Sequence, residues 1–206
     1  MSAVETKVVR IRKSISIVLS GSLNPVHCGH VGLLIEVKKF LEEKFNYTVV
    51  NGFLAPSSDK YVLFKLGEGA MGLKDRIEMC KLAAVGHDWM KVCVWGIASS
   101  VNTARKLERE TKHPVLQIGG ADYVFKSKLW RYPFICFGRK GDTERVMAAL
   151  KNNKINKDFI MIEKEIPDDI SSTVIRKYFM SGDYVTAVKL KLIPESVGDY
   201  LKRLGE

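Results

Sequence analysis

The amino-acid sequence predicts an α/β fold, with a doubly wound parallel sheet, helices on both faces of the sheet and a helical C-terminal segment. Two observations predict it. Short apolar runs rich in β-branched residues alternate with runs of helical spacing along most of the chain. Such alternation is typical of right-handed strand–helix–strand units, whose ligands sit at the carboxyl ends of the strands.

The first such unit lies near the N-terminus. Residues 15–20 are apolar and β-branched, as in a buried strand. Residues 21–30, called the anion loop below, contain the turn formers Gly21, Asn24, Pro25 and Gly29. Residues 31–43 place apolar side chains at helical spacing. The sequence therefore predicts a strand, a tight loop and a helix.

The anion loop has the chemistry of a phosphate site. A loop that leads into a helix directs backbone N–H groups and the positive end of the helix dipole toward one point. His27 and His30 end the loop, and imidazoles donate hydrogen bonds to phosphate oxygens, more strongly when protonated. Gly29 lies between them and permits a close approach to the backbone. The pattern suits a triphosphate.

The remaining elements follow in the same alternation. Strands are expected at residues 47–54, 91–95, 115–118, 134–137 and 159–162. Helices are expected at 73–85, 101–110 and 143–151, and three more close the chain at 172–180, 183–190 and 194–204. Residues 55–72 form the longest stretch without a pattern, and such loops are usually functional or mobile.

Length and charge limit the interpretation further. A chain of 206 residues is expected to form one domain, 1–206, with an α/β core at 14–165 and a helical part at 166–206. The net charge of +10 suits polyanionic small-molecule substrates. The basic residues are scattered and lack a recognition-helix or aromatic-platform pattern, so no nucleic-acid partner is expected.

The four cysteines, Cys28, Cys80, Cys93 and Cys136, are far apart and form no CxxC pair. This spacing favours a reducing compartment over a disulfide framework or a zinc site. Cys28 lies in the anion loop, where a small spacer residue is favoured over a reactive thiol. No secretion signal or membrane span is evident, so we expect a cytoplasmic or nuclear protein without a membrane partner.

Two motifs resemble those of a known enzyme family. Gly21-Ser22-Leu23-Asn24-Pro25-Val26-His27-Cys28-Gly29-His30 resembles the GSxNPxHxGH motif of nucleotidyltransferases. Its Gly-Ser-x-Asn-Pro form is similar to nicotinamide/nicotinate mononucleotide adenylyltransferases. Residues 169–176, Asp-Ile-Ser-Ser-Thr-Val-Ile-Arg, resemble the ISSTxIR element of the same family. The resemblance covers nearly the whole chain and implies a Rossmann-like sheet.

The resemblance implies adenylyl transfer. A mononucleotide phosphate would attack the α-phosphorus of ATP and expel pyrophosphate, giving NAD or its deamido form. Because this nucleophile is already an anion, catalysis needs positioning and charge neutralisation rather than a protein base. Mg²⁺ would be carried by the ATP phosphates with water ligands, so no metal site made by the protein is expected.

The resemblance also assigns residues to the reaction and to ATP. The expected catalytic residues are His27, His30 and Arg176. Arg176 lies in a first helical turn, where a cation is disfavoured unless an anion lies in front of it. Gly120-Ala121-Asp122 resembles a Gly-x-Asp element that holds adenosine, although Asp122 also suits a helix N-terminus. The expected ATP site comprises Gly21, Ser22, Leu23, Gly29, Gly120, Asp122, Ser171, Ser172 and Thr173.

A separate set is expected at the mononucleotide. Trp95 and Trp130 match the tryptophans that line the nicotinamide site in eukaryotic-type members, where a cationic ring gains on the order of 1–2 kcal/mol from an indole face. The sequence departs from the family at two places. Val62-Leu63-Phe64-Lys65 stands where the family has a lysine run, so Lys65 or Lys60 is left to contact the mononucleotide phosphate. Gly96 stands where the family has a glutamate. The expected site comprises Ser22, Tyr61, Lys65, Trp95, Leu129, Trp130 and Arg139.

Other functions are weighed against this one. A pantetheine-phosphate adenylyltransferase or a cytidylyltransferase would not need the Asn24-Pro25 pair or the two tryptophans. A class I aminoacyl-tRNA synthetase would need a KMSKS loop and a tRNA-binding domain. A non-catalytic nucleotide-binding or chaperone protein would not need intact motifs. The residues that follow Trp95, 96–100, carry no charged side chain that would distinguish a carboxamide from a carboxylate on the pyridine ring. The sequence therefore predicts that both mononucleotides are used. A homo-oligomer remains an option.

Overall fold

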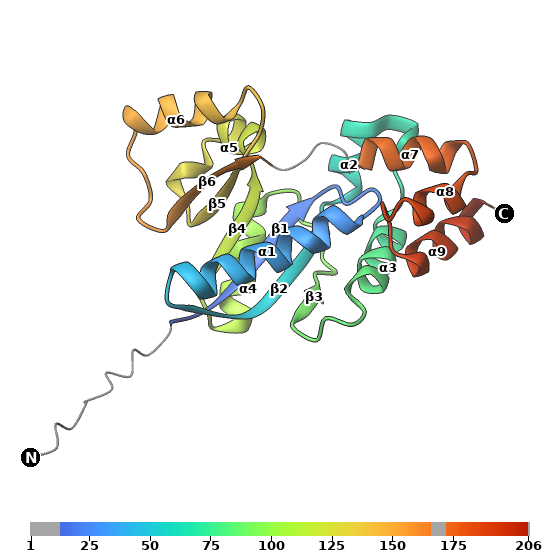
Figure 1. Cartoon of the computed structure of the whole chain (residues 1–206), viewed down its shortest axis with the longest axis horizontal. Coiled ribbons are helices and arrows are strands. Elements are labelled where there is room, and N and C mark those ends of the chain that lie inside the picture. Colours follow the sequence, from blue (N-terminus) through green and yellow to red (C-terminus); the bar gives the residue numbers. More distant parts are fainter. Residues whose placement is uncertain (1–12, 166–171, 206) are drawn as a thin grey trace, which may run out of the picture.

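The computed structural model describes residues 13–165 and 172–205. Six parallel strands form one sheet in the order β3-β2-β1-β4-β5-β6, with helices on both faces (Figure 1). The expected α/β fold with a doubly wound parallel sheet is therefore confirmed.

The strands are β1 (Lys13–Gly21), β2 (Tyr47–Pro56), β3 (Met90–Val92), β4 (Val115–Gly120), β5 (Phe134–Gly138) and β6 (Phe159–Glu165). The helices are α1 (Cys28–Lys44), α2 (Asp59–Leu66), α3 (Leu73–Ala84), α4 (Ser100–Thr111), α5 (Ala121–Ser127), α6 (Thr143–Lys151), α7 (Ser172–Met180), α8 (Tyr184–Lys189) and α9 (Glu195–Gly205). Two 3₁₀ turns are η1 (Gly67–Gly69) and η2 (Leu129–Arg131).

The strand order reverses at the centre of the sheet. From β1 the chain runs outward to β2 and β3, then crosses to the other side of β1 and continues through β4, β5 and β6. The carboxyl ends of β1 and β4 therefore flank a switch point, where open α/β sheets bind their ligands. The anion loop follows β1, and Gly120 ends β4, so both predicted nucleotide elements begin at this point.

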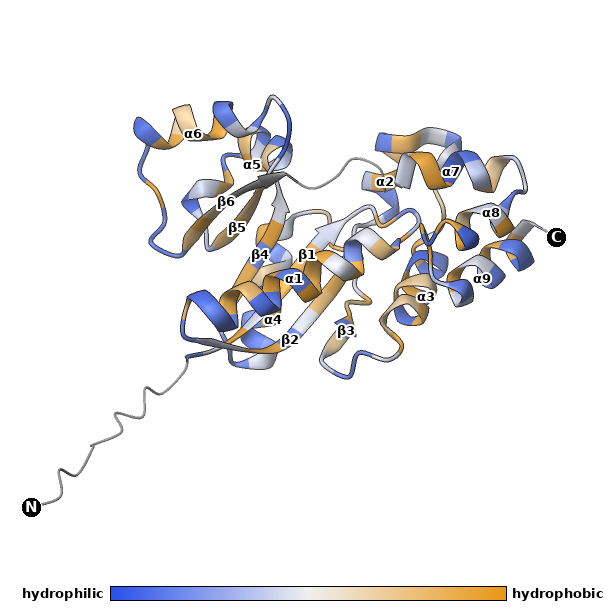
Figure 2. Cartoon of the chain, viewed as in Figure 1, coloured by the Kyte–Doolittle hydropathy of each residue, from blue (hydrophilic) through white to orange (hydrophobic). Residues whose placement is uncertain are grey.

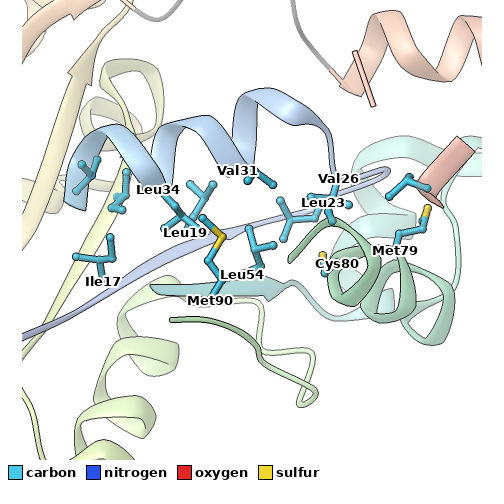
Figure 3. Packing of buried hydrophobic residues seen from close by; sticks show 14 of the residues in the cluster. Ile17, Leu19, Leu23, Val26, Val31, Leu34, Leu54, Met79, Cys80 and Met90 are labelled. Carbon is cyan, nitrogen blue, oxygen red and sulfur yellow. The ribbon is translucent and has the colours of Figure 1, made fainter. Parts of the chain in front are cut away.

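The central strands are rich in apolar residues because core clusters cover both of their faces. Ile15, Ile17 and Leu19 of β1 lie in the largest cluster of buried residues, together with the buried face of α1 (Figure 3). The intervening Val18 lies in a second cluster that includes Leu107 of α4. Because successive side chains of a strand point to opposite faces, a strand covered on both faces is apolar throughout. Figure 2 shows hydrophobic colour on parts of β2 and β4, with paler segments between them.

Several expected boundaries are wrong. Residues 55–72 are not irregular: they contain α2, which begins where the Ser58 hydroxyl accepts a hydrogen bond from the Tyr61 N–H, and η1. α1 begins at Cys28 instead of residue 31, because His27 serves as its N-cap. β3 ends at Val92, so Trp95 lies after the strand. α5 and η2 were not expected, because both are shorter than two turns and carry little periodicity.

Candidate active site

The anion loop follows a constrained path between β1 and α1. Leu23 has a φ of 45°, in the left-handed region, and the Asn24-Pro25 peptide bond is cis. A left-handed conformation costs a non-glycine residue roughly 1–2 kcal/mol. The Leu23 and Val26 side chains are both buried in the core (Figure 3), and burial of this kind offsets such a cost. The Ser22 Oγ atom is buried and makes no hydrogen bond within the described residues, a feature common at ligand sites.

The two histidines lie together at the start of α1. His27 is 6% exposed, and its ring centroid lies 3.6 Å from that of the partly buried His30, with 28° between the ring planes. The Nδ1 atom of His30 accepts a hydrogen bond from the His27 backbone N–H at 3.2 Å. Because Nδ1 is the acceptor, a neutral His30 carries its proton on Nε2, which can donate it to an oxyanion.

Both imidazoles are neutral near pH 7. Burial, and secondarily the charge of Arg139, lowers the pKa of His27 from 6.5 to about 4. Burial also lowers the pKa of His30 well below its usual value, with further contributions from His27 and Arg139. An anion placed beside these rings would raise both pKa values, because it favours the charged form. By linkage, protonation of either imidazole strengthens the binding of a neighbouring phosphate.

Asn24 joins the anion loop to the segment before α3. Its buried side-chain amide donates from Nδ2 to the Gly69 carbonyl at 2.8 Å, and its Oδ1 accepts from the Met71 N–H at 2.7 Å. A carboxylate at this position has no donor for the first bond. The sequence indicated Asn24 only as a turn and motif residue, and the structure adds this long-range pairing.

Arg76 of α3 is a site residue that the motifs did not indicate. Its side chain is 0% exposed and donates three hydrogen bonds of 2.9 Å: Nε to the Met71 carbonyl, Nη1 to the Ser22 carbonyl and Nη2 to Asp59 Oδ1. One sequence signal could have found it. Arg76 lies on the same helical stripe as the buried Met79, Cys80 and Ala83, and a charge on such a stripe requires hydrogen-bonding or ionic partners.

The first two turns of α7 contact the anion loop from the other end of the chain. The Ser172 hydroxyl donates to the Pro25 carbonyl at 3.1 Å. Arg176 donates from Nη1 to the Asn24 carbonyl at 2.9 Å and from Nη2 to the Thr173 hydroxyl at 3.0 Å. The two motifs, about 150 positions apart, therefore meet, while the expected contact of Ser171 falls outside the described residues. Desolvation lowers the pKa of Arg176, which still stays charged at neutral pH.

A carboxylate and a guanidinium lie at the carboxyl end of β4. Arg139 Nε is 3.9 Å from Asp122 Oδ1. A Cβ atom at Gly120 would lie 2.7 Å from that carboxylate oxygen and 3.0 Å from Arg139 Nε, so glycine leaves the space that both groups use. Asp122 lies in the first turn of α5, where the helix dipole favours its charge. Arg139 also affects the pKa of His27, which links this edge electrostatically to the anion loop.

The two expected tryptophans lie in different clusters. Trp130 is 3% exposed and packs with Leu129 between α5, β5 and α6. Trp95 borders the cluster beneath α4, and the ammonium of Lys106 lies 4.4 Å from its ring centroid. The hydroxyl of Tyr123 donates to Ser100 Oγ at 3.0 Å and joins α5 to α4 between these clusters. The two indoles therefore belong to separate clusters that this hydroxyl bond joins.

Tyr61 and Lys65 lie on α2, and both are exposed.

The backbone at Gly96 accounts for glycine at the position where the resemblance led us to expect a glutamate. Its φ of 61° favours glycine, and a Cβ atom there would overlap the Leu73 side chain.

The described residues contain no group of three or more His, Cys, Asp or Glu side chains able to hold a metal ion. No helix in the described part of the chain has both the length and the apolar character to cross a membrane.

Comparison with known proteins gives one family. The family described as cytidylyltransferase-like matches residues 18–178. A nicotinamide/nicotinic acid mononucleotide adenylyltransferase of Arabidopsis thaliana is 23% identical over 219 residues, covering 91% of this chain and 87% of the relative. The type 2 enzyme of the same name from Xenopus tropicalis is 29% identical over 75 residues, which is 36% of this chain and 23% of the relative's length.

Two solved structures share the fold. Both are Plasmodium falciparum nicotinic acid mononucleotide adenylyltransferase, one complexed with NaAD and the other with APC. Their TM-scores are 0.63 and 0.64, and each is 13% identical to this chain. The alignments cover 94% of this chain and 97% and 96% of theirs. At this identity the likeness shows the fold alone.

Proposed function

The chain belongs to the cytidylyltransferase-like family, and within it we propose that it transfers the adenylyl group of ATP to nicotinamide or nicotinate mononucleotide. The products are NAD or its deamido form, and pyrophosphate. One observation carries the proposal: Arg176 and Ser172 hydrogen-bond to the Asn24 and Pro25 carbonyls, which brings cationic and hydroxyl groups to the loop that holds the histidines. The printed names of the relatives favour a pyridine mononucleotide as the acceptor.

In the proposed reaction the mononucleotide phosphate is the nucleophile, and the protein stabilises the charge that develops. An oxygen of the mononucleotide phosphate bonds to the α-phosphorus of ATP, and the bond from that phosphorus to the bridging oxygen breaks. Negative charge then moves onto the departing pyrophosphate. His30, through its Nε2 proton, His27 and Arg176 stabilise this charge. One preorganised donor of this kind contributes about 100- to 1000-fold to the rate.

ATP is held from two sides in this proposal. Backbone and side-chain groups of the anion loop, at Gly21, Ser22, Leu23 and Gly29, contact the phosphates, together with Ser171, Ser172 and Thr173 at the start of α7. Gly120 and Asp122 hold the adenosine, with the carboxylate accepting from ribose hydroxyls. Mg²⁺ neutralises phosphate charge when bound. Because the described residues lack an acidic cluster, its ligands come mainly from phosphate oxygens and water.

The mononucleotide lies toward α2 and α5. Tyr61 and Lys65, or Lys60, approach from α2, and Ser22 and Arg139 supply further polar groups. Trp95, Trp130 and Leu129 form the apolar surroundings of the pyridine ring. Lys106 covers one face of Trp95, so a cationic ring reaches that face only if the ammonium moves away. The mononucleotide side is therefore expected to rearrange on binding.

The cysteines support a reducing compartment, which we take to be the cytoplasm or the nucleus. All four are free thiols, although Cys80, Cys93 and Cys136 are buried. Burial raises the pKa of Cys93 and of Cys136 to about 12, so these thiols stay protonated and unreactive.

A panel of acceptors tests the proposal against other transferases. The protein is incubated with ATP or CTP, Mg²⁺ and one of four acceptors: nicotinamide mononucleotide, nicotinate mononucleotide, pantetheine phosphate or phosphocholine. Pyrophosphate release is then measured. We expect release only with ATP and the two pyridine mononucleotides, at efficiencies within about tenfold of each other, or about 1.4 kcal/mol. Release with another acceptor, or with none, contradicts the proposal.

A further inference from the structure

Arg76 lies beneath the candidate site and touches three separate segments of it. The Ser22 carbonyl belongs to the anion loop, the Met71 carbonyl to the segment that also binds Asn24, and the Asp59 carboxylate to the first turn of α2. α2 carries Tyr61 and Lys65, which we assign to the mononucleotide. One guanidinium therefore connects the proposed mononucleotide side with the proposed phosphate side.

Full burial of this charge is not explained by stability alone. Arg76 is 0% exposed, whereas the side chain of its partner Asp59 is 62% exposed. Taking a cation out of water is expensive, and buried ion pairs are often replaced by apolar side chains with neutral or stabilising effect. What an apolar side chain does not supply is directional bonding to three acceptors at once. The planar fork of arginine does so, and the point charge of lysine does not.

The bonds continue beyond Arg76. Met71 accepts from Arg76 through its carbonyl and donates to Asn24 through its N–H. The Asn24 carbonyl in turn accepts from Arg176. A continuous set of hydrogen bonds thus runs from Asp59 on α2, through Arg76 and the anion loop, to the catalytic cation we assign on α7. This set of hydrogen bonds connects α2 with groups that would contact ATP.

We propose that Arg76 is a positioning residue, which fixes α2 against the anion loop so that the mononucleotide phosphate is set relative to the α-phosphorus of ATP. Asp59 is the link through which α2 is held. The inference rests on the proposed function for its catalytic consequence. The coupling of α2 to the anion loop is independent of that function and can be measured without activity.

Asp59→Ala tests the link, and Asp75→Ala is its matched control. Asp59 and Asp75 both lie in the first turn of a helix, and each accepts one side-chain hydrogen bond. Asp75 is adjacent to Arg76 in sequence, but its partner is the Tyr200 hydroxyl of α9 and not a group of the anion loop. We expect Asp59→Ala to raise the KM for the mononucleotide at least fivefold and the KM for ATP less than twofold. Asp75→Ala should change neither by more than twofold.

Amide hydrogen exchange supplies the second measurement. In Asp59→Ala, peptides covering α2 and residues 21–27 should both exchange faster than in the wild type, and in Asp75→Ala they should not. Arg76→Lys, which keeps the charge, should show the same paired loss of protection and a fall in kcat of at least tenfold.

The outcomes are distinguishable. Equal KM changes in the two alanine variants, or faster exchange in α2 with an unchanged anion loop, overturn the positioning role. A wild-type protein without adenylyl transfer contradicts the proposed function instead, and the exchange data then still decide whether Arg76 couples α2 to the loop.

Discussion

The two sides of the switch point are held by different kinds of contact. On the β1 side, the side chains of Asn24, Arg76 and Arg176 hydrogen-bond to backbone carbonyls at 2.8–2.9 Å. On the β4 side, Trp130 and Leu129 lie in an apolar cluster, and a Tyr123–Ser100 hydroxyl bond joins α5 to α4. Directional bonds hold the first region, and packing defines the second.

This difference predicts different functional consequences. Hydrogen bonds fix atoms in direction as well as distance, which is what stabilisation of developing charge requires. Apolar packing is less directional, and its neighbours can adjust to a ring that enters. Substitutions of His30 and Arg176 on the β1 side should therefore act mainly on kcat or on ATP binding, and substitution of Trp130 on the β4 side mainly on the KM for the mononucleotide.

The largest effect is expected for His30→Ala. Loss of the Nε2 donor should lower kcat about 100-fold or more, by analogy with loss of one preorganised donor, while mononucleotide binding changes little. Steady-state kinetics measure it, with His87→Ala, in the turn after α3, as the control. Near wild-type turnover in His30→Ala would remove the histidine from the mechanism.

The next effect concerns pH and stability. The pKa of His27 is about 4 in the folded protein and 6.5 in the reference state, so the unfolded chain binds more protons between these values. Stability attributable to His27 is complete above pH 6.5 and is lost as the pH falls toward 4, by roughly 2–3 kcal/mol. Urea unfolding of wild type and His27→Gln across this range measures it. Parallel pH profiles for the two proteins would contradict the lowered pKa.

Arg176→Lys should have a smaller effect. Lysine keeps the positive charge but cannot bond both the Asn24 carbonyl and Thr173 and also present a flat fork to phosphate. We expect the Kd for ATP to rise about tenfold with the melting temperature nearly unchanged. Isothermal titration calorimetry with a non-hydrolysable ATP analogue gives the value. An affinity equal to wild type within error would make Arg176 a purely structural residue.

The smallest effect is expected on the β4 side. Trp130→Phe keeps an aromatic ring in the cluster and reduces the indole surface, so the KM for both mononucleotides should rise about threefold to fivefold, with that for ATP unchanged. Trp89→Phe is the control, because Trp89 is a partly buried residue that packs against Gly52. A defect confined to ATP would move Trp130 away from the pyridine ring and erase the contrast between the two sides.

The same contrast explains which features the sequence revealed. Arg176, expected in a first helical turn, is the fifth residue of α7 and lies in its second turn. The strand–loop–helix unit does follow from local patterns, and the structure has it. The roles of Asn24 and Arg76 as long-range hydrogen-bonding groups do not, because their partners lie 45–47 and 54 positions away in the chain. The placement of Trp95 and Trp130 in separate clusters depends on how α4 and α5 pack, which no spacing rule encodes.

The sequence did not predict α2 for a similar reason, because this helix depends partly on a contact that is distant in the chain. Val62 is its only buried residue, and Leu63 and Phe64 are exposed, so its apolar pattern does not follow the helical stripe that predicts a helix. The helix depends on capping by Ser58 and on the bond between Asp59 and Arg76. Only the first of these is local.

Isotopic labelling of ATP tests directly whether the mononucleotide phosphate attacks its α-phosphorus at the anion loop. ATP labelled at either the α- or the γ-phosphorus is incubated with Mg²⁺, nicotinamide mononucleotide and the wild-type protein, with His30→Ala in parallel. We expect α-label in the dinucleotide, γ-label in pyrophosphate, and both signals reduced about 100-fold or more in the variant. α-Label recovered as free AMP, or γ-label on the mononucleotide, would contradict this expectation.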